Sequence, residues 1–367
     1  MSLPSVLVNM LWCVPGKVGG SEEYLVRQLL GLAELPEPRW RPTVAAAQGL
    51  GVAHPELSAV ADVIEPAFES TRRLRRIAGE ITWLRGHSAN VSLVHHGGGT
   101  APIGARRPYV LSIHDLQFRT YPQYFSPVKR AYLSAIIPPS ARRAAMVAVP
   151  SEYVRGAVVR AYGIPDERVA VVPHGIEPGL VDEVTSAREL REKYRLGDGP
   201  VIVYPAVTHP HKNHRFLLEM MRAHWTDPNL RLVLAGGEGL AEAEVAAALD
   251  PRVRRVGRVS AADRNGLLAM ADAMVFPSQY EGFGAPLIEA MVLGAPVISS
   301  DATCMPHIVG NAGLVRPLTT DGWADVLDEA RTRRDELVAA GHIRAQDFTS
   351  AASGAALAAV YEKALST

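Results

Sequence analysis

Residues 276–301 read FPSQYEGFGAPLIEAMVLGAPVISSD. An apolar strand ends near Pro277, a loop broken by Gly282 and Gly284 follows, and a helix is expected to begin at Pro286, whose missing N–H costs nothing in a first turn. Such a loop lets the backbone approach a ligand, and the exposed N–H groups at the start of a helix attract phosphate. The segment therefore predicts a phosphate site that needs no metal.

Two glutamates flank this loop. Glu281 precedes it and Glu289 lies inside the helix. Carboxylates accept hydrogen bonds from hydroxyl groups, so two of them around a phosphate site fit a ligand with sugar hydroxyls on both sides of a diphosphate. We therefore predict a nucleotide sugar as the ligand. The alternative is an ordinary strand, loop and helix with two solvated glutamates.

Outward from this segment, short β-rich apolar runs alternate with longer helical patterns, which is typical of parallel strands joined by crossover helices. In the first half, strands are expected at 6–10, 43–47, 91–95, 109–114, 146–149 and 169–172. In the second half, strands are expected at 201–204, 230–235, 274–276 and 296–299, and helices at 241–249 and 262–271. Ligands bind at the carboxyl ends of such strands, so the functional residues should follow them.

The chain should form two α/β domains, because 367 residues exceed the size at which one core usually stops growing. Turn residues, a charged helix and a GDG breaker place the hinge near 178–200. The first domain is then 1–183 and the second 197–350. A last helix within 351–367 can pack on either domain, including back on the first.

Composition excludes several classes of protein. The 38 Lys and Arg residues balance 38 Asp and Glu residues, whereas a protein that coats nucleic acid needs a surplus of basic side chains. Cys13 and Cys304 are too far apart in sequence to indicate a disulfide framework or a zinc site. The chain shows neither a basic leader nor an apolar run of the ~20 residues that span a bilayer, so we expect a cytoplasmic protein.

A lysine follows the first strand of the second half, in VIVYPAVTHPHKNH at 201–214. As a compact point charge, Lys212 is well placed to neutralise the oxygens of a leaving diphosphate. Three histidines surround it, at positions 209, 211 and 214. They could instead bind a metal, but no strand-loop geometry forces them to converge, and we expect no metal here.

Two loops in the first half carry further candidates. Gly19 and Gly20 follow the first strand and precede a helix that should begin near Ser21; the spacing is not the GxGxxG of dinucleotide sites, and the pair alone is either a turn or a site. His114 and Asp115 end another strand. The imidazole could hydrogen-bond a donor sugar, although a histidine at a strand end is more often structural.

The ordered combination of PS, EGFG, P and E at 277–289 resembles the signature of the large retaining GT-B glycosyltransferase family, the family 4-like enzymes, which contains bacterial mannosyl-, glucosyl- and N-acetylglucosaminyltransferases. The HD pair at 114–115, followed by a Tyr-Pro stretch, is similar to another element of that family. The resemblance implies two Rossmann-like domains with parallel sheets that face each other across a cleft. The first would bind the acceptor and the second the donor.

The resemblance also implies residue roles. The catalytic residues would be His114, Lys212 and Glu281, and the donor-binding residues Gly19, Gly20, Val256, Phe283, Gly284, Ala285, Pro286, Leu287 and Glu289. Glu281 would contact the transferred sugar, Glu289 the ribose, and the backbone at Val256 the base. The family often has an arginine five residues before the lysine, where this chain has Val207; whether a histidine of 209–214 replaces it stays open.

The implied function is the retaining transfer of a hexose from a nucleotide diphosphate sugar to a glycan, lipid or small-molecule acceptor, with neither metal nor cofactor. GDP-mannose is the first expectation for the donor, because HDLQF and HPHKNH resemble mannosyltransferase-like members. Three alternatives remain. They are a hydrolase that uses Glu281 and Glu289 as acid and base, a nucleotide-sugar epimerase of similar two-domain plan, and a non-enzymatic nucleotide-sugar or glycan-binding protein.

The stretch at 71–86, TRRLRRIAGEITWLRG, places Leu74, Ile77, Ile81 and Leu84 at helical spacing among five arginines. This pattern is typical of a solvated surface helix. It also fits peripheral contact with anionic lipid at the inner face of a membrane.

Overall fold

The computed structural model describes residues 4–36, 39–176 and 179–366. The ends of the predicted ranges at 1–3 and 367, and residue 178 of the expected hinge, therefore lie outside the described residues. The chain divides into two compact units. Unit 1 comprises Met1–Gly175 and Phe348–Thr367, and unit 2 comprises Ile176–Asp347. In the described part of the chain, no helix combines the length and the apolar character that crossing a bilayer requires.

The division falls between residues 175 and 176, just before the hinge expected near 178–200. The reason lies in the packing of the segment after 178. Leu180 is buried, and the Asn265 side-chain amide donates to the carbonyl oxygens of Leu180 (3.0 Å) and Glu183 (3.2 Å). These contacts attach the expected linker to unit 2.

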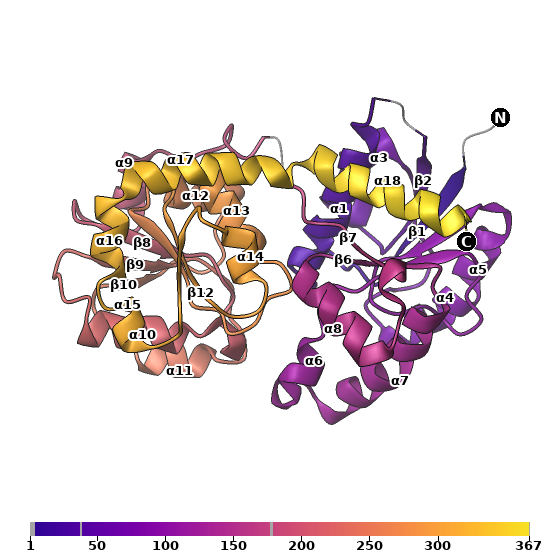
Figure 1. Ribbon diagram of the computed structural model, residues 1–367, viewed down its shortest axis with the longest axis horizontal. Helices are drawn as coiled ribbons and strands as arrows, with labels where there is room; N and C mark the ends of the chain where they lie inside the picture. The colour runs from indigo at the N-terminus through magenta and orange to yellow at the C-terminus, as the bar shows by residue number, and fades with distance from the viewer. Residues whose placement is uncertain (1–3, 37–38, 177–178, 367) are drawn as a thin grey trace. The chain divides into compact units, whose positions relative to one another are not determined.

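Unit 1 contains a seven-stranded sheet, and its strand pairs are parallel (Figure 1). From edge to edge the strands are β3 (Asp62–Ile64), β2 (Arg41–Ala46), β1 (Ser5–Met10), β4 (Leu93–His96), β5 (Tyr109–Ser112), β6 (Met146–Val149) and β7 (Val169–Val171). Its helices are α1 (Gly20–Ala33), α2 (Leu50–Ala53), α3 (Leu57–Val60), α4 (Arg73–Ile81), α5 (Trp83–His87), α6 (Gln117–Thr120), α7 (Pro127–Arg143), α8 (Glu152–Tyr162) and α18 (Ser350–Ser366). The order of strands reverses between β1 and β4, which is where ligands bind in sheets of this kind.

The last helix, α18, packs on α1 in unit 1. The two backbones touch, since a Cβ added to Gly31 would lie 1.8 Å from the Ser350 carbonyl oxygen. A buried polar chain also fixes α18 on the sheet. The His95 ring joins the Tyr361 hydroxyl through Nδ1 (2.8 Å) and the Ser112 hydroxyl through Nε2 (2.8 Å).

Unit 2 contains a six-stranded sheet, again with parallel strand pairs. From edge to edge the strands are β10 (Val253–Arg255), β9 (Arg231–Leu234), β8 (Val201–Tyr204), β11 (Ala273–Phe276), β12 (Val297–Ser300) and β13 (Leu314–Arg316). Its helices are α9 (Ala187–Lys193), α10 (His214–Ala223), α11 (Glu242–Ala247), α12 (Ala261–Ala269), α13 (Ala285–Val292), α14 (Met305–Val309), α15 (Thr320–Trp323), α16 (Val326–Thr332) and α17 (Arg334–Ala345). The predicted α/β class with two parallel sheets is confirmed.

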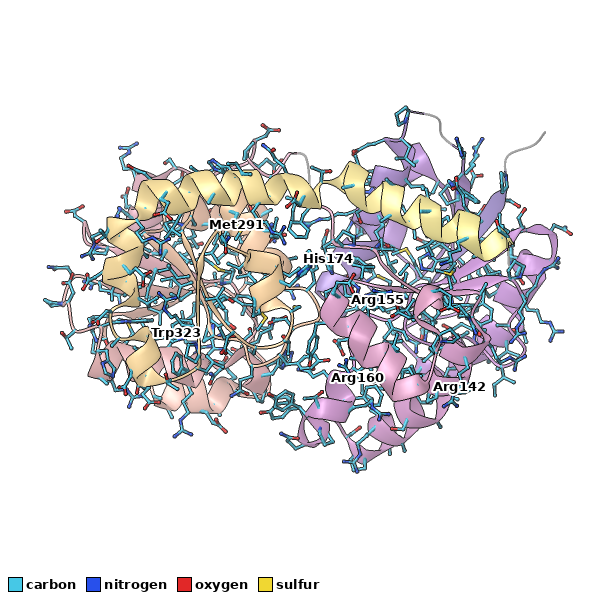
Figure 2. All side chains as sticks on the ribbon, in the orientation of Figure 1. Arg142, Arg155, Arg160, His174, Met291 and Trp323 are labelled. Carbon is cyan, nitrogen blue, oxygen red and sulfur yellow. The ribbon has the colours of Figure 1, made fainter. Side chains whose placement is uncertain are left out.

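Aromatic packing anchors the helices of unit 2 around Trp323, which is fully buried (Figure 2). Its ring lies edge-on to Phe216 of α10, with centroids 5.2 Å apart, and contacts Trp225 just after that helix. The Trp225 indole N–H donates to the Trp323 carbonyl oxygen (3.2 Å), so a polar bond supplements the apolar burial.

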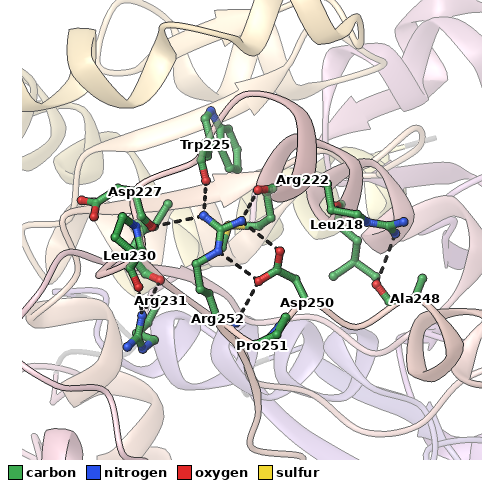
Figure 3. A network of polar contacts seen from close by, with 12 residues as sticks. Leu218, Arg222, Trp225, Asp227, Leu230, Arg231, Ala248, Asp250, Pro251 and Arg252 are labelled. Atoms are coloured by element: carbon green, nitrogen blue, oxygen red, sulfur yellow. Dashed lines mark hydrogen bonds and ion pairs between the residues drawn. The ribbon is translucent and has the colours of Figure 1, made fainter.

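Arg252 ties the end of α10 to the start of β10 (Figure 3). Its guanidinium bonds to both carboxylate oxygens of Asp250 (3.0 and 2.9 Å) and also donates to the carbonyl oxygens of Met221 and Trp225. The Arg252 hydrogen bonds lower the pKa of Asp250 and outweigh its burial. One side chain thus satisfies carbonyl groups that a helix end leaves without partners.

Replacing Arg252 with leucine should destabilise unit 2 by about 3 kcal/mol, because Asp250 and the helix carbonyls lose a charged partner while largely shielded from water. Urea unfolding followed by Trp fluorescence measures this loss. Arg254→Leu, two residues further on in β10, is the matched control with a smaller expected effect. Equal stability of Arg252→Leu and wild type would contradict the assignment.

Candidate functional site

Lys212 and Glu281 come together in unit 2. The loops that carry them follow β8 and β11, which are neighbours at the point where the strand order of this sheet reverses. Lys212 Nζ lies 2.6 Å from Glu281 Oε1, and the two side chains are only 19% and 13% exposed. The structure thus brings Lys212 and Glu281 together at the position where parallel sheets bind ligands.

The backbone around this pair is held by hydrogen bonds from the core. The buried Tyr204 hydroxyl donates to the Lys212 carbonyl oxygen (2.7 Å), and the Gln279 amide donates to the His211 carbonyl oxygen (2.8 Å). The second bond joins the two loops directly. Lys212 and Glu281 thus stand on loops fixed to each other, which limits the reorganisation needed to meet a ligand.

The loop after Glu281 rests on a segment that the sequence did not single out. The Glu281 amide donates to Thr303 Oγ1 (3.1 Å), and the Cys304 thiol donates to the carbonyl oxygens of Glu281 and Phe283 (3.3 Å each). Burial raises the pKa of the Cys304 thiol, so it remains a donor. Thr303 has a φ of 53°, a left-handed conformation that side chains rarely adopt, so backbone strain accompanies this support.

Helix α13 begins at Ala285, one residue before the predicted start, and Pro286 sits in its first turn. Gly284 caps the helix with a φ of 87°, and a Cβ there would lie 2.9 Å from Leu287 Cδ1. No side chain caps this end, so its N–H groups are suited to an anion. The Leu287 amide already donates to the Gly284 carbonyl oxygen (2.9 Å), so a phosphate at this amide would share it with the turn.

Glu289 and Val256, which the resemblance also assigns to donor binding, already lie close to other groups of unit 2. Glu289 is buried on α13, and Arg264 Nη1 of α12 lies 3.9 Å from its Oε2. The Val256 amide donates to the Leu234 carbonyl oxygen (3.1 Å) as part of the sheet. If this backbone reads a base, it must do so through the Val256 carbonyl.

In unit 1, the glycine pair lies at the start of α1. The helix begins at Gly20, next to the expected start near Ser21, and its cap is Gly19, with a φ of 63° that favours glycine. Neither added Cβ would meet another atom within 4 Å. The conformation of Gly19, rather than crowding, therefore accounts for the glycine there, and α1 has an N-terminus without a side-chain cap.

His114 lies just after β5, and its ring contacts two aromatic rings. The rings of Trp12 and Tyr24 have centroids 5.7 and 5.3 Å from that of His114, and Tyr24 stacks in turn on His174 at 4.2 Å. His114 Nε2 donates to the Gly97 carbonyl oxygen (2.7 Å), and burial lowers the His114 pKa to about 4. The ring is therefore neutral near pH 7, with its lone pair on Nδ1.

Comparison with known proteins covers both units. Residues 18–180 match the family model described as Glycosyltransferase Family 4, and residues 199–332 match that of Glycosyl transferases group 1. The chain belongs to the family 4-like glycosyltransferases.

Curated relatives of this family 4-like chain include two O-antigen enzymes. It is 30% identical over 215 residues to O-antigen chain mannosyltransferase B of Escherichia coli, covering 56% of each chain. It is 27% identical over 248 residues to O-antigen chain mannosyltransferase RfbU of Salmonella typhimurium, covering 66% of this chain and 65% of that one. The matches thus span somewhat more than half the length of these relatives.

Among solved structures, Anabaena HepE in complex with UDP and glucose aligns with a TM-score of 0.75 and 20% identity, covering 98% of this chain and 99% of that one. At this identity the likeness shows the fold alone. That fold is GT-B, as the family 4-like signature implied.

His211 and His214 do not supply the charge of the arginine that the family 4-like chain lacks at position 207. Burial lowers the pKa of His211 to about 3 and that of His214 to about 4, and the charge of Lys212 acts in the same direction on both. Both rings are therefore neutral near pH 7. The rings of His209 and His211 stack with centroids 5.8 Å apart. His211 therefore contributes an uncharged ring, rather than a second cation, next to Lys212.

Sequence reasoning missed a hydrogen-bonded pair beside the glycine loop. Glu22 Oε2 accepts from the Gly16 amide (3.1 Å), and Glu22 Oε1 contacts His54 Nε2 (2.9 Å). Burial opposes the charged form of His54, but hydrogen bonds to Glu22 and Glu56 outweigh it and raise the His54 pKa. The sequence carried a weak signal, an acidic residue in the first turn of α1, but none for the distant histidine.

Sequence reasoning also missed the three consecutive glycines at 97–99, although they directly follow a predicted strand. The Gly97 carbonyl orients His114. A Cβ at Gly98 would lie 2.6 Å from the Trp12 ring, so this backbone passes close against the aromatic wall of the His114 site. These glycines permit the close approach that places His114.

Three buried histidines should make unit 1 sensitive to acid. Burial lowers the pKa of His95 and His96 to about 3 and that of His114 to about 4, whereas an unfolded chain binds these protons near pH 6.5. The unfolded state therefore takes up protons first as pH falls, and each histidine should remove about 1.4 kcal/mol of stability per pH unit below 6.5.

Urea unfolding between pH 7.5 and 5 measures this slope. His96→Asn should flatten it, whereas His87→Asn, at an exposed histidine of α5, should not. A slope that stays the same in His96→Asn would contradict the prediction.

Proposed function

We propose that this chain is a retaining, metal-independent hexosyltransferase that moves a sugar from a nucleotide diphosphate donor to a hydroxyl of a glycan, lipid or small-molecule acceptor. The observation that carries the proposal is the Lys212–Glu281 pair at the reversal point of the unit 2 sheet, beside the uncapped start of α13. A lysine and a helix N-terminus both favour a diphosphate. Glu281 adds an acceptor for sugar hydroxyls.

Breaking the bond between the anomeric carbon and the diphosphate builds negative charge on the leaving oxygen. Lys212 and the amides at the start of α13 would stabilise that charge more in the transition state than in the ground state. The acceptor oxygen bonds to the anomeric carbon on the same face, and its proton passes to the leaving phosphate. His114 Nδ1, a lone-pair acceptor, would take a hydrogen bond from a hydroxyl of the donor sugar.

The donor is proposed to be a nucleotide sugar, with GDP-mannose first. Support for mannose comes from the names of the two O-antigen mannosyltransferase relatives, and support for a nucleotide from HepE, which was solved with UDP and glucose. A thermal-shift screen of GDP, UDP, ADP and dTDP sugars would identify the base, since a ligand that binds the folded state raises its apparent stability.

Turnover separates this function from its alternatives. NMR of the donor with and without simple alkyl glycosides should show nucleotide release that depends on the acceptor, and an α-linked product from an α-linked donor. Full conversion of the donor to another nucleotide sugar without acceptor would indicate an epimerase. Release of free sugar at an unchanged rate with or without acceptor would indicate a hydrolase, and binding without turnover a binding protein.

We also propose that α4 contacts anionic lipid, because part of its apolar stripe is exposed. Leu74 is 83% exposed, and Ile81 is exposed as well, whereas Leu84, which the structure places in α5, is buried. Arginines at 72 and 75 are exposed beside Leu74. Sedimentation with vesicles that contain or lack an anionic lipid tests this contact, and Leu74→Glu should abolish it.

A further inference from the structure

Two buried ionisable side chains join the loop after β1 to the segment after β2 in unit 1. Glu22 lies in the first turn of α1, His54 directly follows α2, and the two residues are only 6% and 7% exposed. His54 Nε2 lies 2.9 Å from Glu22 Oε1, and His54 Nδ1 lies 3.0 Å from Glu56 Oε1. Because β1 and β2 are neighbouring parallel strands, this contact lies at the carboxyl edge of the sheet.

The two carboxylates determine the charge of His54. An ionised carboxylate only accepts hydrogen bonds, so a ring that faces a carboxylate at each nitrogen carries a proton on both. Burial opposes this charge, but hydrogen bonds to Glu22 and Glu56, together with the charge of Glu23, raise the pKa of His54 above its usual value. Burial and the same charges of Glu22 and Glu23 raise the pKa of the Cys13 thiol, which therefore stays neutral. His54 thus supplies a positive charge that balances the buried Glu22 carboxylate.

Glu22 also holds the loop at 16–20, which leads into α1. Its second carboxylate oxygen, Oε2, accepts from the Gly16 amide (3.1 Å), and its own amide donates to the Gly19 carbonyl oxygen (2.9 Å). Residues 16, 17, 19 and 20 are exposed, whereas Val18 packs against the core. The conformation of this exposed loop therefore depends strongly on the buried Glu22.

We propose that Glu22 and His54 are positioning residues that hold the loop at 16–20 in the conformation that meets the donor phosphates. The loop ends at Gly19 and Gly20, where α1 begins without a side-chain cap and its N–H groups suit an anion. His54 orients the Glu22 carboxylate, and Glu22 in turn orients the Gly16 amide. The inference rests on the proposed transfer reaction, with the donor-binding role that the resemblance assigns to the two glycines.

This hold on the loop should weaken as pH rises. Because the pKa of His54 in the folded chain is raised above 6.5, the ion pair contributes fully below pH 6.5 and is lost as pH rises through the folded pKa. The neutral ring can donate to only one of its two carboxylates. We therefore expect the donor KM to increase above pH 6.5.

Two measurements on the full chain test this role. Without nucleotide, ¹H–¹⁵N spectra follow the Gly16 amide, whose hydrogen exchange should be about tenfold faster in Glu22→Ala. Steady-state transfer then uses GDP-mannose, or the nucleotide sugar that the thermal-shift screen selects. Glu22→Ala and His54→Leu should each raise the donor KM by about tenfold and leave kcat within about twofold of wild type, because the loop acts on binding.

Glu22→Gln is the conservative variant that should restore the loop. Its amide oxygen can still accept from Gly16, and its NH₂ can donate to Nε2 of a neutral His54. This variant should keep a donor KM near that of wild type at pH 6.5 and should lose the increase at higher pH. Glu23→Gln, at the neighbouring and more exposed glutamate, is the matched control and should keep the wild-type donor KM.

Unchanged Gly16 exchange in Glu22→Ala would overturn the inference, as would a donor KM that is the same in Glu22→Ala and wild type. An equal increase of donor KM with pH in Glu22→Gln and wild type would also contradict it. If the Gly16 amide responds as expected but no nucleotide sugar supports transfer, the hold on the loop stands and the proposed function fails.

Discussion

Lys212→Met should reduce turnover in the transfer assay by about 10²- to 10³-fold, with a smaller change in donor affinity. The ammonium lies where the leaving diphosphate would gain charge, and removal of one such preorganised donor typically has this effect. Methionine preserves much of the volume and the contact with the Phe276 ring, over which Lys212 Nζ lies at 5.5 Å. Steady-state rates of nucleotide release measure the loss.

The difficulty is that Lys212→Met also leaves Glu281 without its cation. The double variant Lys212→Met/Glu281→Gln separates the two effects. If the lysine serves only to neutralise Glu281, the double variant should turn over as fast as Glu281→Gln alone. We expect it to match that single variant in stability but to be slower in turnover. Lys129→Met, at an exposed lysine of unit 1, is the control for the loss of a charge.

Gly31→Ala should destabilise unit 1 by roughly 3 kcal/mol, at the upper end of overpacking effects. Its Cβ would lie 1.8 Å from the Ser350 carbonyl oxygen and 3.2 Å from the Gly354 nitrogen, and neither is a side chain that can turn away. Helix α18 would have to move off α1, which would stretch the hydrogen bond between His95 and Tyr361. Urea unfolding and amide exchange of α18 measure this change.

Gly86→Ala is the matched control, since this glycine also lies in a helix of unit 1 and its added Cβ meets nothing within 4 Å. It should be neutral or stabilise the unit by up to about 1 kcal/mol, because alanine restricts the unfolded chain. Similar stabilities of Gly31→Ala and Gly86→Ala would show that α18 does not rest on Gly31 as described.

Much of the fold could be predicted because the pattern of apolar residues along the sequence is a local property. The short apolar runs predicted strands such as Met146–Val149 and Val201–Tyr204 with their observed bounds. Strands β3 and β13 were not predicted; each has three residues at a sheet edge, too few to show a pattern. The boundary between the units was also placed too late, because the contacts of Asn265 with Leu180 and Glu183 join residues more than 80 positions apart.

By itself, the sequence determined the parallel α/β architecture and the approximate positions of the glycine loop, His114, Lys212 and the Glu281 loop, because strand ends, glycines and helix starts are encoded within a few residues. Only the tertiary structure decided which of these groups meet and in what protonation state. The order of strands brings Lys212 to Glu281, and burial makes His114, His211 and His214 neutral. The burial of a side chain and the residues that a loop contacts both depend on residues distant in the sequence. A short sequence pattern therefore cannot predict them.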